Sequence, residues 1–452
     1  MARASHARES LPREIPVDVH GIERERISIP ALRVLYRLHE AGHRACLVGG
    51  AVRDLLLGEQ PKDFDVATDA HPEQVKRLFR NCRLIGRRFR LAHVTYGREI
   101  VEVATFRAPH DLDDGADSDD IECVTRDNCY GTIEQDAERR DFTVNALYYD
   151  PVAQSVLDFG SGLEDLAAGE LRLIGDPRIR LCEDPVRMLR AVRFVGKHGF
   201  RLDPELHAAI NALAGRIVDA APARLFDEVI KLFHNGRARQ TFLELEARNL
   251  FEPLFPQTKR HFDREGIDSL SRRFLLTALD NTDRRVQADQ GVNPAFLYAA
   301  LLWGPVQARA AFEQQLEHGS ETAMDLAIEA VLREQSKTVM IPRRFGGMMR
   351  EIWEFQPRLE SQRDARHVPR LLAKARFRAA YDFYCLRAQS GQADPAVCEY
   401  WTEQQGLHGD LVGSDDLHPS AGDDSSGSSR RGRSGRRRGG RRRGGSRATG
   451  VR

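Results

Sequence analysis

The stretch LVGGAVRD at residues 47–54, followed by KDFD at residues 62–65, decides how the chain is interpreted. The apolar run at 45–48 predicts a short strand, which Gly49 and Gly50 end before a helix. A glycine pair here lets the backbone approach a ligand closely, and the N-terminus of a helix offers N–H donors to an anion. The pair alone does not distinguish a phosphate site from an ordinary turn.

Asp63 and Asp65 alternate with apolar residues, as in a half-buried strand. At this spacing both carboxylates leave the same face of a strand and repel each other unless a cation lies between them. Mg²⁺ takes such oxygen ligands and completes its shell with phosphate and water. The alternative is a solvated strand edge that carries two acids.

Glu102 is a third candidate carboxylate. Residues 93–96 and 99–105 flank Gly97-Arg98 and predict a hairpin, in which Glu102 is the lone charge of an apolar strand between Val101 and Val103. A charge in such a place needs a metal, an arginine or water, so a structural salt bridge is the alternative to metal ligation. Three carboxylates on adjacent strands could hold two metal ions for in-line phosphoryl transfer.

Two later motifs add candidate nucleotide contacts. In RRDFTVNA at 139–146, Arg140 offers forked donors to phosphate, and Asp141 could accept from a ribose hydroxyl or act near the metals. In EDPVRMLR at 183–190, Asp184 is expected to cap a helix, with Pro185 at its first position. Arg187 and Arg190 share a face of that helix, where a guanidinium could meet a base edge. A purely structural cap is the alternative for Asp184.

The composition argues against a membrane-spanning protein and a disulfide framework. The chain has 452 residues, 41% of them hydrophobic, and no run approaches the about 20 apolar residues of a bilayer helix. Its seven cysteines are scattered, which suits a reducing cytosol. The basic N-terminus lacks the apolar segment of a secretory signal. We therefore expect a cytoplasmic protein.

Charge is distributed unevenly along the chain. Lys and Arg number 68 against 67 Asp and Glu, for a net charge of +1. Residues 430–452, however, hold 11 arginines and no acid, so the remainder is acidic by about ten charges. Residues 412–452 are rich in Gly, Ser and Arg and are expected to be disordered. The acidic stretch at 111–120 predicts a surface loop, and residues 1–25 are expected to be loosely ordered.

The order of the motifs divides the chain. A small mixed α/β unit is expected up to about residue 150. Amphipathic stretches at 184–199, 204–218, 222–234, 238–250, 294–315 and 321–335 predict helices from there on. We expect five parts: a flexible N-terminus, an α/β part, two helical parts and a disordered basic tail. Their boundaries are 1–27, 28–150, 151–270, 271–411 and 412–452.

Together, GGAVRD…KDFD, RRDFTVNAL and EDPVRMLRAVRF resemble the class II nucleotidyltransferases, which are bacterial poly(A) polymerases and CCA-adding tRNA nucleotidyltransferases. The resemblance implies a polymerase-β-like α/β head, an all-α neck and body, and transfer of a nucleotide from an NTP to an RNA 3′ end with Mg²⁺. It also implies a role for each matched residue. These are metal ligation by Asp63 and Asp65, with Asp141 also counted among the essential acids; triphosphate or sugar contact by Gly49, Gly50, Arg53, Arg140 and Asp141; and base reading by Asp184 and Arg187.

Two features favour the poly(A) polymerases over the CCA-adding enzymes. LIGRRFRLAHV at 84–94 resembles the segment that marks the former, and its Arg87 and Arg88 would suit phosphate contact. The basic tail suits an enzyme that acts on many RNA 3′ ends, because arginines on a flexible tether can follow any sequence. The tail arginines expected to bind RNA are Arg430, Arg431, Arg436, Arg437, Arg438, Arg441, Arg442 and Arg443.

The leading hypothesis is template-independent polyadenylation with ATP as substrate and two Mg²⁺ ions. CCA addition is the nearest alternative, and a non-catalytic RNA-binding protein is the alternative of another class. The expected substrates are the 3′ ends of mRNA and small regulatory RNA. RNA-decay or RNA-chaperone proteins are conceivable partners, no membrane is involved, and the chain is expected to be a monomer.

Overall fold

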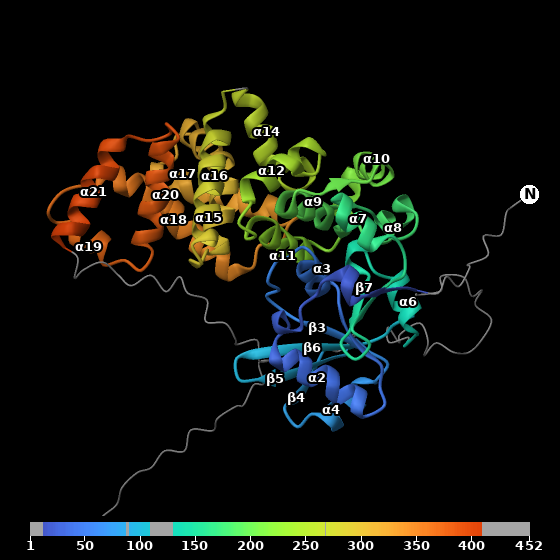
Figure 1. Cartoon of the computed structure of the whole chain (residues 1–452). Helices are drawn as coiled ribbons and strands as arrows, with labels where there is room; N and C mark the ends of the chain where they lie inside the picture. Colours follow the sequence, from blue (N-terminus) through green and yellow to red (C-terminus); the bar gives the residue numbers. More distant parts are fainter. Residues whose placement is uncertain (1–11, 87–89, 109–129, 267, 409–452) are drawn as a thin grey trace, which may run out of the picture. The chain divides into compact units, whose positions relative to one another are not determined.

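A large mixed sheet comes first along the chain. The computed structural model describes residues 12–86, 90–108, 130–266 and 268–408. The strands of the sheet are β1 (Arg13–Pro16), β2 (Ala45–Val48), β3 (Asp65–Thr68), β4 (Cys82–Ile85), β5 (Leu91–Tyr96), β6 (Glu99–Thr105), β7 (Leu147–Asp150) and β8 (Ser155–Asp158). Their order is β1-β8-β7-β2-β3-β6-β5-β4. β3 and β6 are parallel neighbours and lie side by side in Figure 1.

Short helices connect and cover these strands. They are α1 (Val17–His20), η1 (Arg24–Arg26), α2 (Ile29–Glu40), α3 (Gly50–Leu56), α4 (Pro72–Leu78), α6 (Ile133–Glu138), η2 (Thr143–Asn145), α7 (Gly162–Ala168) and α8 (Pro177–Glu183). Two further short strands, β9 (Glu170–Leu171) and β10 (Arg201–Leu202), form a separate parallel pair. The α/β character predicted for this part of the chain is confirmed.

The two faces of the large sheet differ because successive strand residues point to opposite sides. On one face Val101 and Val103 of β6 are buried in the core that also holds Leu35 of α2 and Val75 of α4. The opposite face carries a smaller apolar cluster, which includes Ile133 of α6. α2 and α4 therefore pack on one face of the sheet and α6 on the other.

Helices make up the rest of the described chain, as the amphipathic stretches predicted. They are α9 (Val186–His198), α10 (Pro204–Leu213), η3 (Ala214–Asp219), α11 (Pro222–Phe233), α12 (Ala238–Ala247), α13 (Phe251–Leu254), α14 (Pro256–Glu265), α15 (Leu270–Gln287), α16 (Pro294–Gln315), α17 (Ser320–Gln335), α18 (Arg343–Ser361), α19 (Val368–Leu372), α20 (Phe377–Gln389) and α21 (Pro395–Leu407). No helix of the described residues is both long enough and apolar enough to cross a membrane.

The prediction that residues 1–25 are loosely ordered is wrong for their described part. Arg13–Pro16 forms β1 and pairs antiparallel with β8, and Ile15 is 2% exposed. The strand was missed because its residues, REIP, end in a proline, which is tolerated at the edge of a sheet. β1 and β8 lie outside the range 28–150 predicted for the head, so strands from both sides of it complete the sheet. The boundaries of the predicted parts otherwise stay predictions.

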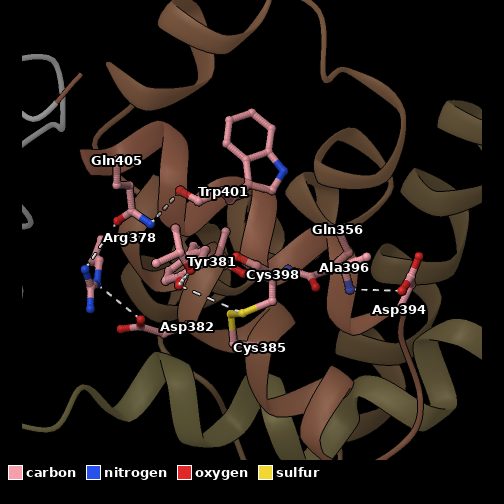
Figure 2. Close-up of a disulfide and its surroundings, with 12 residues drawn as sticks. Gln356, Arg378, Tyr381, Asp382, Cys385, Asp394, Ala396, Cys398, Trp401 and Gln405 are labelled. Atoms are coloured by element: carbon pink, nitrogen blue, oxygen red, sulfur yellow. Dashed lines mark hydrogen bonds and ion pairs between the residues drawn. A yellow bond between two sulfur atoms is a disulfide. The ribbon is translucent and has the colours of Figure 1, made fainter. Parts of the chain in front are cut away.

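Cys385 and Cys398 form a disulfide, whereas we expected scattered thiols (Figure 2). They lie 13 residues apart in the chain, and the antiparallel packing of α20 and α21 brings their Cα atoms to 5.5 Å, a distance typical of disulfides. Figure 2 shows Tyr381 beside the bond, with its hydroxyl oxygen 3.9 Å from Sγ of Cys398. Sequence spacing could not reveal the pair, because it depends on how the two helices pack.

Removing the disulfide should destabilise the α20–α21 hairpin. A cross-link over a loop of this length lowers the entropy of the unfolded chain, which stabilises the fold by about 3 kcal/mol. We expect Cys385→Ala/Cys398→Ala to lower the free energy of unfolding of the body by up to that amount. Urea unfolding followed by tryptophan fluorescence measures it, because all three tryptophans lie at or after position 303. Cys82→Ala, at a free cysteine, is the control; equal losses in the two variants would contradict the prediction.

Candidate active site

Strand register brings two of the predicted acids together. Asp65, the first residue of β3, pairs with Glu102 of the parallel strand β6, and Glu102 pairs with His93 of β5. Asp63 lies before β3 begins rather than on the strand, so the expectation that both aspartates sit on one strand is corrected. Its charge nevertheless acts on Asp65. These groups lie on the face of the sheet opposite α2 and α4.

The acids affect one another electrostatically. The pKa of Asp65 is raised from 3.8 to about 6, first by burial of the carboxyl and then by the negative charges of Glu102 and Asp63. Arg140 and His93 oppose the rise. A carboxyl that is hard to ionise beside two others is what a cation-binding group of oxygens requires, since a bound cation would remove the repulsion.

His93 is a neighbour that our sequence analysis missed. Its Nε2 atom lies 3.2 Å from Oε2 of Glu102, whose side chain is 41% exposed. The hairpin register could have revealed it, because counting outward from the turn at Gly97-Arg98 places residue 93 opposite residue 102. Glu102 therefore has a histidine partner and remains open to solvent.

A second group of possible metal ligands lies elsewhere. Ligand atoms of Asp54, Glu59 and His198 are all within 4.8 Å of one another. The Asp54 carboxylate, however, accepts hydrogen bonds from Nε of Arg53, at 2.9 Å, and from its NH2 nitrogen. Burial, Arg53 and Lys197 lower the pKa of His198 to about 4. The two cations make this group a poorer place for a metal ion than the group around Asp65.

Gly49 and Gly50 make the sharp turn between β2 and α3. Gly49 has a φ of +69°, which L side chains rarely adopt. A Cβ atom at Gly49 would lie 3.4 Å from the NH1 nitrogen of Arg140, so the glycine leaves room for this guanidinium. The turn and Arg140, predicted from separate motifs, are thus brought together.

The side chains of Tyr148 and Asp136 hold Arg140 in place. Its Nε donates to the hydroxyl of Tyr148 at 2.8 Å, and its NH2 nitrogen pairs with Asp136 at 2.9 Å. The Tyr148 hydroxyl also donates to Asp136 at 2.8 Å. The guanidinium is therefore oriented before any ligand arrives, which lowers the ordering cost of binding an anion.

Arg53 is engaged within the protein. Its NH1 nitrogen donates to Oδ1 of Asn145 at 2.8 Å, its other nitrogens donate to Asp54, and the guanidinium lies 4.9 Å from the ring centroid of Phe194. The residue is only 7% exposed. In this arrangement Arg53 connects α3 to η2 and α9, and it does not offer a free guanidinium to a triphosphate.

Asp141 is also engaged. Its Oδ2 atom pairs with the NH2 nitrogen of Arg190 at 2.6 Å, and its Oδ1 atom accepts from the backbone N–H of Phe142 and from Nδ2 of Asn145. Burial raises the pKa of this carboxyl, but Arg190 and the two hydrogen bonds outweigh it and the net pKa is lowered. Asn145 thus joins Arg53 to Asp141, a role that its place in RRDFTVNA did not reveal.

The predicted base-reading residues lie at the junction of α8 and α9. α9 begins at Val186, with Pro185 as its cap position, one residue later than predicted. Asp184 still accepts the backbone N–H of Val186, and both its oxygens accept from Arg224 of α11, at 2.8 and 2.7 Å. Such forked pairs fix the plane of a carboxylate.

Arg187 contacts the helix before it rather than Asp184. Its NH1 nitrogen donates to the carbonyl of Arg180 at 2.6 Å and to Glu183 at 3.2 Å. Arg180, which the motifs did not single out, donates to the carbonyls of Arg139 and Arg140. This link ties the helical junction to the Arg140 segment. Arg87, Arg88 and the tail arginines Arg430, Arg431, Arg436, Arg437, Arg438, Arg441, Arg442 and Arg443 lie outside the described residues.

Three parts of the chain match known protein families. Residues 45–172 match the poly A polymerase head domain, residues 199–262 match a probable RNA and SrmB-binding site of polymerase A, and residues 317–443 match the polymerase A arginine-rich C-terminus. Poly(A) polymerase I of Salmonella typhimurium is 46% identical over 401 residues, which cover 86% of this chain and 85% of that protein. The Escherichia coli O157:H7 protein of the same name is 49% identical over 382 residues, covering 83% and 81%.

The chain belongs to the poly(A) polymerase I family. It is therefore a nucleotidyltransferase that polyadenylates RNA, which excludes the non-catalytic alternative. The CCA-adding enzyme of Bacillus subtilis is 37% identical over 288 residues, covering 62% of this chain and 70% of that enzyme. The enzymes of the nearest alternative hypothesis, CCA addition, are therefore relatives of this chain.

Solved structures share the fold. The CCA-adding enzyme of Bacillus stearothermophilus in complex with CTP matches with a TM-score of 0.57 at 23% identity, covering 84% of this chain and 83% of that one. The Thermotoga maritima CCA-adding enzyme complexed with tRNA matches with a TM-score of 0.56 at 18% identity, covering 87% and 85%. The nucleotidyltransferase head followed by helices is thus confirmed.

The raised pKa of Asp65 predicts a pH effect on stability. A carboxyl with a folded pKa of about 6 and an ordinary value of 3.8 stabilises the fold at low pH, and this contribution is lost as the pH rises through about 6. In a buffer with a chelator, we expect Asp65→Asn to gain thermal stability relative to the unsubstituted chain between pH 4.5 and pH 7.5. Asp18→Asn, at an exposed acid of α1, should show no such trend; a difference independent of pH would contradict the prediction.

The Asp184–Arg224 pair predicts an effect on nucleotide choice. Arg224→Lys removes the forked geometry but keeps the charge. The Arg224 side chain is 51% exposed, so we expect a change in stability of at most about 1 kcal/mol. The ratio of kcat/KM for ATP to that for CTP should fall about tenfold, because Asp184 would lose its fixed plane. Arg216→Lys, at an exposed pair with Asp219, is the control; an unchanged ratio would count against a positioning role.

Proposed function

We propose that Asp63, Asp65 and Glu102 hold the Mg²⁺ used in polyadenylation. The observation that carries this proposal is the pairing of Asp65 with Glu102 across β3 and β6. The negative charge of Asp63, which precedes β3, also raises the pKa of Asp65. The set consists of carboxylate oxygens, which are the ligands that Mg²⁺ prefers.

Two Mg²⁺ ions bound there would lower the pKa of the RNA 3′-hydroxyl and stabilise the leaving pyrophosphate. The protein's own part is to hold the charges of Asp65 and Glu102 on one face of the sheet, with that of Asp63 just before β3. His93, at 3.2 Å from Glu102, limits the positions of that side chain. ATP is the substrate, and its AMP is transferred to the RNA end.

The turn at Gly49 and Gly50 is the proposed cradle for the triphosphate. Its backbone can approach a phosphate closely, and Arg140 lies directly beside it. Arg140 reaches this place already oriented by Asp136 and Tyr148. We assign Arg53 a supporting role, because its donors are used by Asp54 and Asn145.

Asp141 is proposed as a positioning residue rather than the third metal ligand. Its carboxylate is taken by Arg190, Asn145 and a backbone N–H, whereas Glu102 lies next to Asp65. Through these contacts Asp141 holds α9, and with it the junction that carries Asp184 and Arg187. Asp184, oriented by Arg224, and Arg187 would then select adenine, because unpaired polar groups penalise a wrong base.

The substrates are RNAs, and we propose that they include the 3′ ends of mRNA and small regulatory RNA. The tail arginines would hold such ends by sequence-independent contact with phosphates. RNA-decay or RNA-chaperone proteins as partners, a monomeric state and a cytoplasmic location remain our proposals. They rest on the sequence and on the chemistry of the reaction.

A nucleotide-incorporation assay tests the function directly. The protein is incubated with an unstructured oligoribonucleotide and each NTP separately, and in parallel with a tRNA trimmed at its 3′ end. We expect long extension with ATP alone. Addition of two C and one A to the trimmed tRNA, without extension of the oligoribonucleotide, would instead establish the CCA-adding alternative.

The metal assignment predicts that Asp63→Ala or Asp65→Ala abolishes AMP incorporation while RNA binding persists. Loss of a carboxylate removes a ligand without touching the proposed RNA contacts. Incorporation is followed with labelled ATP, and RNA binding by fluorescence anisotropy, with Asp18→Ala as the control. Incorporation above background in the Asp63→Ala/Asp65→Ala double variant would overturn the assignment.

A further inference from the structure

A large groove lies on the face of the sheet that the candidate active site does not use. One wall is α2. The other is formed by Leu78, the last residue of α4, by residues 79–81 after it, and by Tyr96 of β5. The cavity measures about 640 Å³. The proposed metal ligands point away from it, because Glu102 lies on the opposite face from Val101 and Val103, which pack under α2 and α4.

Arginines line both walls of the groove. Arg33 and Arg37 belong to α2, Arg24 lies at η1, and Arg80 lies across from them; all four are exposed. Glu40 is the one acid in the lining, and its carboxylate lies 3.7 Å from Arg37. Among the described residues neither Arg33 nor Arg80 has an ion-pair partner. The groove therefore carries net positive charge, although residues 1–429 together are acidic.

Aromatic side chains lie among these arginines. Tyr36 and Tyr96 line the groove, and the guanidinium of Arg24 lies 5.0 Å from the centroid of the Tyr36 ring. The Tyr36 hydroxyl donates to the carbonyl of Pro151 at 3.3 Å, which restrains the ring. Arginines for phosphates combined with aromatic rings for bases are the recurring chemistry of single-stranded nucleic acid sites.

We propose that this groove binds a segment of the RNA substrate upstream of the 3′ end that is being extended. The 3′ end itself must reach the acids on the other face of the sheet, so an RNA in the groove is a different part of the strand. The volume lies in the range of about 300–1,000 Å³ typical of ligand pockets, which corresponds to one or two nucleotides. The proposal rests on RNA being the substrate and on the acids of the other face being the place of reaction. The contact between RNA and the groove does not itself require a metal ion.

The groove predicts a dependence on RNA length. A short oligoribonucleotide bound at the active site is expected not to reach the groove, whereas a longer one reaches it as well. Each phosphate contact that is lost should lower the slope of log K against log salt by about 0.7. Losing one arginine from each wall should therefore lower the slope by about 1.4 and weaken binding of long RNA roughly tenfold or more at 0.1 M salt.

The test variant is Arg33→Ala/Arg80→Ala. Its matched control is Lys76→Ala/Arg77→Ala, which removes the same charge from exposed positions of α4 that do not line the groove. Binding of 5′-labelled oligo(A) of 6 and 30 nucleotides is measured by fluorescence anisotropy over a salt series, together with AMP incorporation on the 6-mer. We expect weaker binding and a lower slope only for the 30-mer and only in the test variant.

Two further variants separate the contributions. Arg33→Lys/Arg80→Lys keeps the charge and should restore most of the slope, and Tyr96→Leu should weaken binding of the 30-mer with little change in slope, since a stacking contact releases no counterions. The proposal is overturned if the test and control variants bind the 30-mer equally. It is also overturned if binding of the 6-mer is weakened as much as binding of the 30-mer. A third contrary outcome is a polyglutamate peptide that displaces the labelled 30-mer as tightly as unlabelled 30-mer does.

Discussion

Repulsion among like charges is the constraint on which the functional arrangement depends. The parallel pairing of β3 with β6 places Asp65 beside Glu102, and Asp63 adds a third charge from just before the strand. A fold gains nothing in stability from this arrangement, as the raised pKa of Asp65 indicates. Such a cost is typical of a site kept for its chemistry, because a bound cation turns the repulsion into ligation.

The helices after the sheet are attached to the site by arginines rather than by apolar packing alone. Arg190 pairs with Asp141, Arg180 donates to the carbonyls of Arg139 and Arg140, and Arg53 lies against Phe194 of α9. Each contact ends within a few residues of the proposed triphosphate cradle. The position of α9, and so of Asp184, is therefore tied to the state of the same segment that carries Arg140.

Much of this could be predicted from the sequence, because strong local patterns decide it. β2 and α16 have the predicted bounds, because turn residues or a proline mark where they begin or end. α16 is not the amphipathic helix that was predicted, however, since residues 297–306 are buried on every side. The sequence also singled out Asp65, Glu102 and Arg140; the structure pairs Asp65 with Glu102, and the charge of Arg140 acts on Asp65. Three features could not be predicted, because they depend on how segments pack against one another. They are the β1–β8 pairing, the Cys385–Cys398 bond, and the position of Asn145 between Arg53 and Asp141.

Acidic and basic side chains lie on opposite faces of the sheet, which the near-zero net charge of the chain does not reveal. Because neighbouring residues of β6 point to opposite faces, Glu102 contributes to an acidic site while Val101 and Val103 support the helix that carries Arg33 and Arg37. The sheet thus separates the acidic side chains on one face from the arginine-lined groove on the other. RNA approaching either face meets a different charge, so contacts upstream can hold the strand without competing with the metal ions for its 3′ end.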